Sequence, residues 1–406
     1  MAEPFFGSAR NLYDSSNEAG LKWMLERKPL HGIYLNTKIN SISLKDYSLE
    51  DGRRGPEWVY GWIQGRGLES IVTHLKSSRF KSNALTDQMH ASASSLYLAL
   101  NSLLSDSGHA YFCYDKLMQP VWNSPHRPLN FNLYDSHIYT YSDVFFAKGL
   151  IAASVHLNSK QTITHVRYLA EIISSIEENR FQTDESIPAN AQALEQQPNS
   201  YGPRMILLGA ANLLQMFGQS NASFFADRFI NYILEKHLDK STSLLRDHID
   251  GDSCNPGHAI EFVGFSLEYL PADTDPGLIA VLEKILLASF YGGFKGPGIC
   301  LDISIQTGCT TSSYYPWWSL PEAIRAAALL YNRTHSVASL TVWKVAHEAF
   351  FRSYWRTSPP IAFQTLTVDG PVDFVPATSD LDPGYHTGLS LLCASKIAEL
   401  CQNSSA

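Results

Sequence analysis

Apolar residues recur at three- and four-residue steps along most of the chain, which is the spacing of the buried face of an α-helix. The pattern predicts helices over residues 94–106, 142–157, 164–179, 226–238, 277–290 and 338–355. Short stretches rich in aromatic and β-branched residues, each beside turn formers, predict hairpins at 31–44, 108–121, 243–252, 292–305 and 361–374. This alternation predicts a repeated unit of two helices and a connection.

Five further helices are predicted to begin directly after these connections. Their segments are RGPEWVYGWIQGRGLESIV, PNSYGPRMILLGA, NPGHAIEFVGFSL, WWSLPEAIRAAALL and DPGYHTGLSLLCA. Four of the five carry Pro, Gly or both near the start, as the beginnings of helices often do. If pairs of helices close into a ring, these starts gather on one face and bring distant residues together. We therefore expect the chemistry on that face.

The composition of the 406-residue chain is that of an ordinary globular protein, with 45% hydrophobic and 17% charged residues. A net charge of −8 and a pI near 5.9 give no basic field for nucleic acid or for an anionic membrane, so neither partner is predicted. No secretory signal is visible, and the six cysteines form no CxxC pair, which argues against a structural zinc site or a disulfide framework. This use of cysteine favours the cytoplasm as the compartment. Since no Pro/Ser-rich linker divides the chain, we expect a single domain over residues 1–406.

Two stretches, CNPGHAIEF and DPGYHTGL, are typical of helix starts with a histidine just inside. Asn255 and Asp382 are good N-cap residues, and each precedes a proline that suits the first helical position. One such histidine is usually structural, but two suggest a functional pair. A helix N-terminus lowers the pKa of His258 whereas the nearby Glu261 would raise it, so together they could hold this base near neutrality. His386 is placed similarly, and two bases on opposite sides of one carbon could invert it.

The segment WWSLPEA has two interpretations. Ser319 and Glu322 have the spacing of a capping box, in which Glu322 only closes a helix end. Alternatively, Trp317 and Trp318 beside a carboxylate are typical of a sugar site, where the ring stacks on indole and its hydroxyl groups meet the acid. A core pair of tryptophans remains the structural alternative.

Arg66 lies between glycines on an otherwise apolar helix that also carries Trp62. Its guanidinium could hold a developing enolate oxygen, although a buried ion pair is the alternative. Tyr141 and Asp143 are predicted at the same cavity, but aromatic residues at helical spacing are more often core. The remaining histidines lack a spacing such as HExxH, and neither GxxxxGK[ST] nor GxGxxG occurs, so no metal and no cofactor is predicted.

Four segments in chain order, GWIQGRGLES, NPGHAIEFVGF, WWSLPEAIRAA and PGYHTGLSLL, resemble the N-acylglucosamine 2-epimerase superfamily. The resemblance implies an all-α (α/α)6 barrel of twelve helices whose central cavity epimerises or isomerises sugars, commonly as a homodimer. It also implies that one histidine takes the C2 proton of the open-chain sugar, that an arginine steadies the enediolate and that the other histidine returns a proton to the opposite face. The residues that match this pattern are Arg66, His258, Glu261, Trp318, Glu322 and His386.

The sequence departs from the family pattern at two places. Family members that act on free mannose or cellobiose typically have a further histidine in the helix that here reads PNSYGPRMILLG, and an arginine often follows the last histidine where this chain has Leu389. The first departure favours an N-acylglucosamine/N-acylmannosamine epimerase over an aldose–ketose isomerase or a cellobiose-type 2-epimerase. A glycoside hydrolase with Glu261 and Glu322 as its acid and base is disfavoured by the paired histidines. Leu389 leaves open a sugar-binding protein without turnover.

Overall fold

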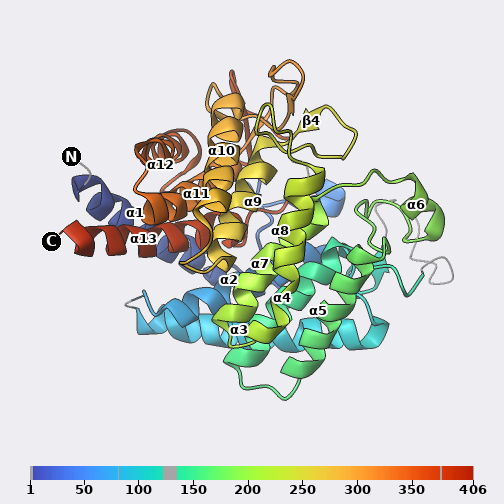
Figure 1. The fold of residues 1–406 in the computed structure, drawn as a ribbon. Helices are drawn as coiled ribbons and strands as arrows, with labels where there is room; N and C mark the ends of the chain where they lie inside the picture. Colours follow the sequence, from blue (N-terminus) through green and yellow to red (C-terminus); the bar gives the residue numbers. More distant parts are fainter. Residues whose placement is uncertain (1–2, 81, 122–134, 375–376, 406) are drawn as a thin grey trace.

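The computed structural model describes residues 3–80, 82–121, 135–374 and 377–405 (Figure 1). Within this part of the chain twelve long helices form the predicted (α/α)6 barrel, six in an inner ring and six outside it. The inner helices are α2 (Gly61–Ser77), α4 (Tyr141–His156), α7 (Gly202–Met216), α9 (Pro256–Tyr269), α11 (Ser319–Thr334) and α13 (Ser390–Ser405). The outer helices are α1 (Glu3–Glu26), α3 (Asn83–Ser107), α5 (Thr162–Glu177), α8 (Phe225–Lys236), α10 (Pro276–Gly293) and α12 (Val337–Ala349).

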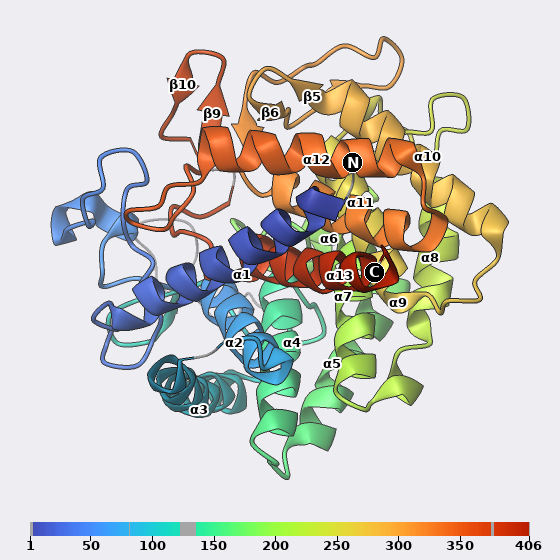
Figure 2. The ribbon, with the colours of Figure 1, turned by 90° about the vertical axis from the view of Figure 1, so that its left-hand side faces the viewer.

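The inner ring closes on itself. Each inner helix packs against the next, and a π-helical turn before α13, η5 (Tyr385–Leu389), packs against α2. The first helix, α1, packs along α13, so both ends of the described chain lie side by side (Figure 2). Because η5 packs against α2, residues near positions 66 and 386 belong to one cavity wall.

Burial separates the two rings in the way the sequence pattern predicts. The inner helices α4 and α9 are buried on nearly all sides, whereas the outer helices α5 and α8 bury one face. The helices α2 and α4 also approach backbone to backbone, since a Cβ built at Gly65 would lie 2.6 Å from the carbonyl of Phe145. This close approach brings the next residue of α2, Arg66, against the first turns of α4.

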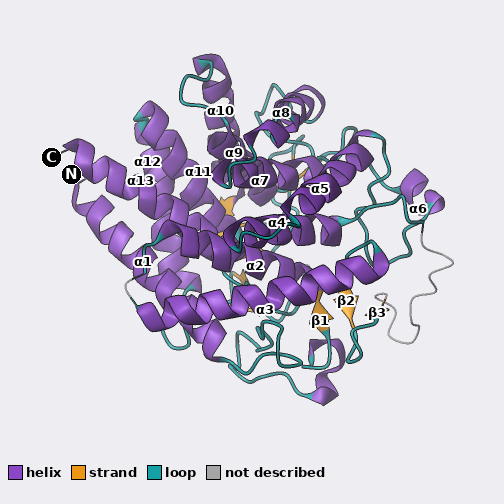
Figure 3. Ribbon diagram, turned by 90° about the horizontal axis from the view of Figure 1, so that it is seen from below, coloured by secondary structure: helices purple, strands orange, loops and turns teal. Residues whose placement is uncertain are grey.

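Short strands and helical turns fill the connections (Figure 3). One three-stranded antiparallel sheet consists of β1 (Val59–Tyr60), β2 (Cys113–Tyr114) and β3 (Pro120–Val121), and another of β8 (Tyr315–Pro316), β9 (Thr365–Thr367) and β10 (Gly370–Pro371). Two antiparallel pairs are formed by β4 (Ser253–Cys254) with β7 (Ile303–Ser304) and by β5 (Phe294–Lys295) with β6 (Gly298–Ile299). The short helices are α6 (Ala191–Gln196), η1 (Leu49–Arg54), η3 (Ser220–Ala222) and η4 (Phe350–Tyr354).

Three of the five predicted hairpins are confirmed, as β2–β3, β5–β6 and β9–β10. The other two, at 31–44 and 243–252, contain only isolated bridges, such as Leu30 with Tyr34 and Leu238 with Leu245. All six cysteines are free thiols, in agreement with the absence of a CxxC pair.

One described helix, α10, is long and apolar enough to cross a membrane by length and hydropathy alone, with a mean hydropathy of 1.2. In the structure it is an outer helix that packs against α9 and α12. Its apolar window is 39% buried inside the protein, and a single helix of this kind is weak evidence for a membrane span.

Candidate functional site

The first turns of the inner helices surround a cavity of about 270 Å³. Eight candidate residues named from the sequence line it, namely Trp62, Arg66, Tyr141, His258, Glu261, Trp317, Trp318 and His386. Another candidate, Glu322, lies directly behind His386. Asp143 does not line the cavity; its carboxylate is buried and accepts hydrogen bonds from the Thr140 and Ala110 amides at 2.7 and 2.8 Å.

His258 occupies the helix start that the sequence predicts. Asn255 is the N-cap of α9, and its Oδ1 accepts the His258 N–H at 3.1 Å. The imidazole stacks on Trp318 with 5.1 Å between ring centroids. This approach needs a glycine at position 257, since a Cβ there would lie 2.5 Å from the Trp318 ring.

The electrostatics of His258 differ from the sequence argument. Burial and then the Arg66 charge lower its pKa, and the carboxylate that opposes this shift is Asp247, not Glu261. Asp247 also accepts the backbone N–H of Asn255 at 2.9 Å, so it ties the loop before α9 to the helix start. Sequence reasoning missed Asp247, and its only signal was an acidic residue in the predicted hairpin just ahead of NPGH.

The helical segment that carries His386 begins differently from the one that carries His258. Asp382 caps the segment as predicted, because its carboxylate accepts the N–H groups of Tyr385, His386 and Thr387 at 2.8, 3.2 and 2.8 Å. The prediction that Pro383 occupies the first helical position is wrong. Gly384 follows in the left-handed region, with φ of 81°, and the chain then makes the π-helical turn η5. The capping therefore holds, but the helix begins later and with a wider turn.

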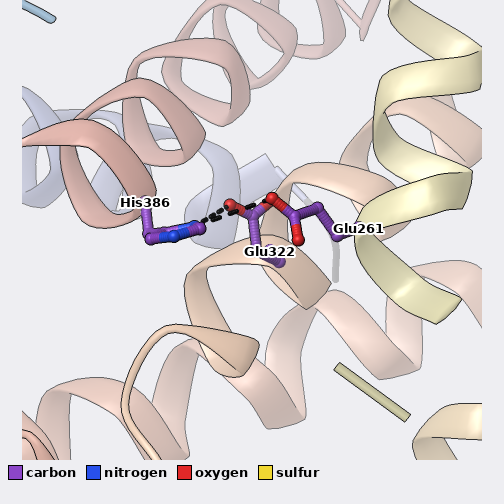
Figure 4. Close-up of side chains that lie close together, drawn as sticks. All are labelled: Glu261, Glu322 and His386. Carbon is purple, nitrogen blue, oxygen red and sulfur yellow. Dashed lines mark hydrogen bonds and ion pairs between the residues drawn. The ribbon is translucent and has the colours of Figure 1, made fainter. Parts of the chain in front are cut away.

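Two buried carboxylates face the inner edge of the His386 ring (Figure 4). Its Nδ1 lies 2.9 Å from Glu322 Oε1 and 3.8 Å from Glu261 Oε1. The other oxygen of Glu322 accepts a hydrogen bond from Arg325 on the same face of α11. The capping-box interpretation of Glu322 is wrong, because the N-cap of α11 is Trp318 and Ser319 Oγ donates instead to the Pro316 carbonyl at 2.9 Å.

Burial dominates the protonation of this cluster. It raises the pKa of Glu261 to about 8, with Glu322 adding to the shift, and it raises the pKa of Glu322 against the opposing charge of Arg325. Burial followed by the charge of Arg66 lowers the pKa of His386 well below its usual value. We therefore assign a neutral His386 and a protonated Glu261 at neutral pH. Glu322 is assigned as ionised on its geometry, because its second oxygen is in direct contact with the guanidinium of Arg325.

Arg66 faces the cavity from α2, where the helix starts at Gly61, after Trp58 and Tyr60. Its guanidinium lies 4.0 Å from the centroid of the Phe145 ring. Among the described residues Arg66 forms no ion pair, and its buried Nε has no hydrogen-bond partner. The buried ion pair considered as its alternative is thus not found, and the guanidinium is free to meet an anionic or polar ligand.

Trp62 and Tyr141 form the neighbouring wall, with 5.7 Å between their ring centroids. A carboxylate that the sequence did not reveal holds this wall in place. Glu185 Oε1 accepts the indole N–H of Trp62 at 2.9 Å and the N–H of Ser142 at 3.0 Å. Burial raises the pKa of Glu185 to about 7.

Glu261, Glu322 and His386 each offer a ligand atom within 4.8 Å of the others, which is close enough to hold a metal ion. However, the Glu322 carboxylate already contacts Arg325 with one oxygen and His386 with the other, so a metal ion would compete with both contacts. The donor set fits the positioning of a histidine at least as well as the coordination of a metal.

Comparison with known proteins supports the fold rather than a close relationship. No family model matches the sequence, and no curated protein is significantly similar to it. The cellobiose 2-epimerase from Spirochaeta thermophila has a TM-score of 0.74 at 12% identity, with 99% of both chains covered. A D-mannose isomerase gives 0.73 at 11% identity, over 95% of this chain and 97% of that one. The cellobiose 2-epimerase from Bacillus thermoamylovorans gives 0.69 at 15% identity, over 96% and 100%. The protein therefore has the (α/α)6-barrel fold of solved sugar epimerases and isomerases, as the sequence resemblance implied.

The two departures from the family pattern fall in different places. The wall formed by α7 presents Gly202, Met205 and Ile206 to the cavity, so the side lacking the extra histidine is apolar. Leu389 does not line this cavity and faces a second one at the opposite end of the barrel.

Proposed function

We propose that the protein is a sugar 2-epimerase of the N-acylglucosamine 2-epimerase superfamily, which interconverts an N-acylglucosamine and an N-acylmannosamine through an enediolate. The observation that carries the proposal is the pair of imidazoles at one cavity. His258 comes from α9 and His386 from the turn before α13, and both rings pack against Trp318, at 5.1 and 5.6 Å. Both pKa values are lowered, so each imidazole is neutral and able to accept a proton at neutral pH.

His386 is the better oriented of the two bases, because a carboxylate contacts its ring. Its Nδ1–H donates to Glu322, which leaves the unprotonated Nε2 for the C2 proton of the open-chain sugar. As the imidazolium forms, the adjacent carboxylate stabilises the new charge. Glu322 and Arg325 act through His386 and are positioning residues.

The remaining steps fall to Arg66 and His258. When the C2 proton leaves, negative charge develops on the carbonyl oxygen at C1, and the unpaired guanidinium of Arg66 is the cation available at the cavity to hold it. His258, which first accepts a proton from solvent at the cavity, then delivers that proton to the other face of C2 to give the 2-epimer, and His386 releases the proton it took to solvent. In the reverse direction the two histidines exchange roles.

The apolar wall supports the choice of substrate. Gly202, Met205 and Ile206 offer a surface for the methyl group of an N-acyl substituent. A neutral disaccharide or free hexose would leave this wall facing hydroxyl groups. An aldose–ketose isomerase is the second candidate, because it needs one proton carrier, and His386 with its carboxylates supplies a complete one.

The carboxylates are poorly placed for glycoside hydrolysis. Glu261 and Glu322 have oxygens within 4.8 Å of each other, and Glu322 lies behind His386 instead of lining the cavity. A hydrolase needs its two carboxyl groups to flank the scissile bond, about 5 Å or more apart. The geometry therefore favours chemistry at C2.

The test is proton NMR in D2O with N-acetylmannosamine, N-acetylglucosamine, mannose, glucose and cellobiose. Wild type should replace the C2 proton of one sugar by deuterium and accumulate its epimer, whereas a ketose would indicate the isomerase. For the substrate whose proton His386 removes, His258→Ala should still exchange the C2 proton without making the epimer, and His386→Ala should do neither. His90→Ala, at an exposed position on α3, serves as control. Binding of a sugar without any exchange would refute the epimerase and leave a sugar-binding protein.

A further inference from the structure

A second cavity, of about 260 Å³, lies at the other end of the inner helices. We call it the distal cavity. Three inner helices line both cavities, with residues two helical turns apart: Arg66 and Thr73 on α2, Glu261 and Glu268 on α9, and Trp318 and Arg325 at α11. Two turns of helix correspond to roughly 10 Å. Tyr385 lines the distal cavity while the next residue, His386, lines the catalytic one. The two cavities thus lie back to back along the barrel axis.

The charges at the distal cavity are unevenly matched. Arg325 carries one positive charge but faces two carboxylates, since it hydrogen bonds to Glu322 and its Nη1 lies 3.7 Å from Glu268 Oε2. The Glu268 carboxylate has two further polar contacts: Asn212 Nδ2 lies 3.3 Å from that oxygen, and the Cys393 thiol, a weak donor, hydrogen bonds to the side chain. Both distances exceed the usual range of about 2.7–3.2 Å for a hydrogen bond from nitrogen. The Glu268 carboxylate is therefore the partner that Arg325 neutralises least.

The other cations near the distal cavity do not replace this missing partner. Lys148 forms an ion pair with Glu69 at 3.2 Å and donates a hydrogen bond to the hydroxyl of Tyr385. Lys396 lines the mouth, is exposed, and forms no ion pair with any residue in the described part of the chain. Its ammonium group is exposed to solvent, where the high dielectric weakens its repulsion of a cation bound at Glu268. The Glu268 side chain is 15% exposed, which leaves it reachable from the mouth.

We propose that the distal cavity binds a small organic cation, a guanidinium or primary ammonium group on a short apolar chain, with its charge paired to Glu268. The carboxylate keeps free acceptor positions for such a donor. Leu213, Leu389 and Leu392 line the same cavity and supply apolar surface for the chain. The site does not depend on the reaction assigned to the catalytic cavity, because binding is measured without turnover.

The experiment is calorimetric titration of the full-length protein with propylguanidinium chloride, with potassium chloride as the control for ionic strength. We expect saturable binding of one cation. Glu268→Gln keeps the shape of the side chain but removes its charge, and should weaken binding about tenfold or more. Glu235→Gln, a surface change on α8 with a side chain 71% exposed, should leave binding unchanged.

Leu389→Arg offers a second, independent variant, because it places a guanidinium from the chain itself into the distal cavity. This variant should no longer bind propylguanidinium, whereas Leu389→Met, which conserves volume, should bind it as wild type does. Absence of saturable binding to wild type, or equal affinity of wild type and Glu268→Gln, would overturn the proposal. If Glu268→Gln does not fold, retained binding by a folded Leu389→Arg would overturn it equally.

Discussion

Replacing Glu322 by glutamine removes the charge that lies between Arg325 and His386 and leaves the size of the side chain almost unchanged. An amide cannot accept hydrogen bonds from both neighbours as the carboxylate does, because one of its two ends is a donor. If the amide oxygen turns to Arg325, its NH2 group faces His386 Nδ1 and forces the ring proton onto Nε2. If the oxygen turns to His386, the NH2 group meets the guanidinium. The first arrangement thus inverts the tautomer of His386, and the second breaks the contact with Arg325 that is seen in the structure.

The size of the effect follows from burial. Glu322 and Arg325 have side chains only 1% and 4% exposed, and breaking a buried pair by removing one partner costs about 3–5 kcal/mol. We expect the lower end of that range, because Arg325 keeps Glu268 at 3.7 Å. The rate of proton abstraction should fall by about 10²- to 10⁴-fold, since His386 loses both its tautomer and the stabilisation of its imidazolium.

The measurements are urea unfolding and C2 deuterium incorporation on the same preparations. Glu348→Gln is the matched control, because Glu348 pairs with Arg352 on the surface of α12 with both side chains about 70% exposed. The control should lose roughly 0.5 kcal/mol or less and keep its rate. If Glu322→Gln loses no more stability than this control and exchanges deuterium within twofold of wild type, the assignment of Glu322 as the partner of His386 is refuted.

Three further predictions test other parts of the site. Arg66→Met should lower kcat by about 10²- to 10³-fold without loss of stability, because Arg66 has no ion pair to break. Arg66→Lys should not restore the rate, since lysine lacks the planar guanidinium fork. A methionine variant that keeps its activity would contradict this prediction. The folded protein holds the Glu261 proton up to about pH 8 whereas a free glutamate releases it near 4.5, so wild type should lose stability as the pH rises through this window. Glu261→Gln should flatten that decline in urea unfolding, and parallel curves would refute the assignment. Glu185→Leu should raise KM by roughly tenfold with little change in kcat, because the indole N–H of Trp62 loses its acceptor. Glu185→Gln keeps an acceptor oxygen and should have a KM near that of wild type. Equal KM values for the two variants would show that the hydrogen bond does not shape the cavity.

Much of the fold was predictable because helix punctuation and periodicity are local. The start of α9 follows from Asn255, Pro256 and the apolar spacing behind them, and the structure confirms it down to the Asn255 cap. The start at Asp382 was predicted only in part. The sequence DPG allows either a proline in the first turn or a left-handed glycine before it, and packing of Gly384 beside Ser70 of α2 belongs to the second arrangement.

The pairing of charges was not predictable in the same way. Arg325 lies three residues after Glu322, so their contact is a neighbour relation along one helix face. The contact of Glu322 with His386 spans 64 residues and exists only because α11, α13 and α2 meet around the barrel axis. Asp247 and Glu185 reach the site from connections whose paths no periodicity encodes. Residues that line the cavity from helix starts, and Glu322 itself, are therefore visible in the sequence, whereas the contacts that set their protonation depend on how distant segments meet. A variant such as Glu322→Gln, which leaves every cavity-lining residue in place, tests one of these long-range contacts directly.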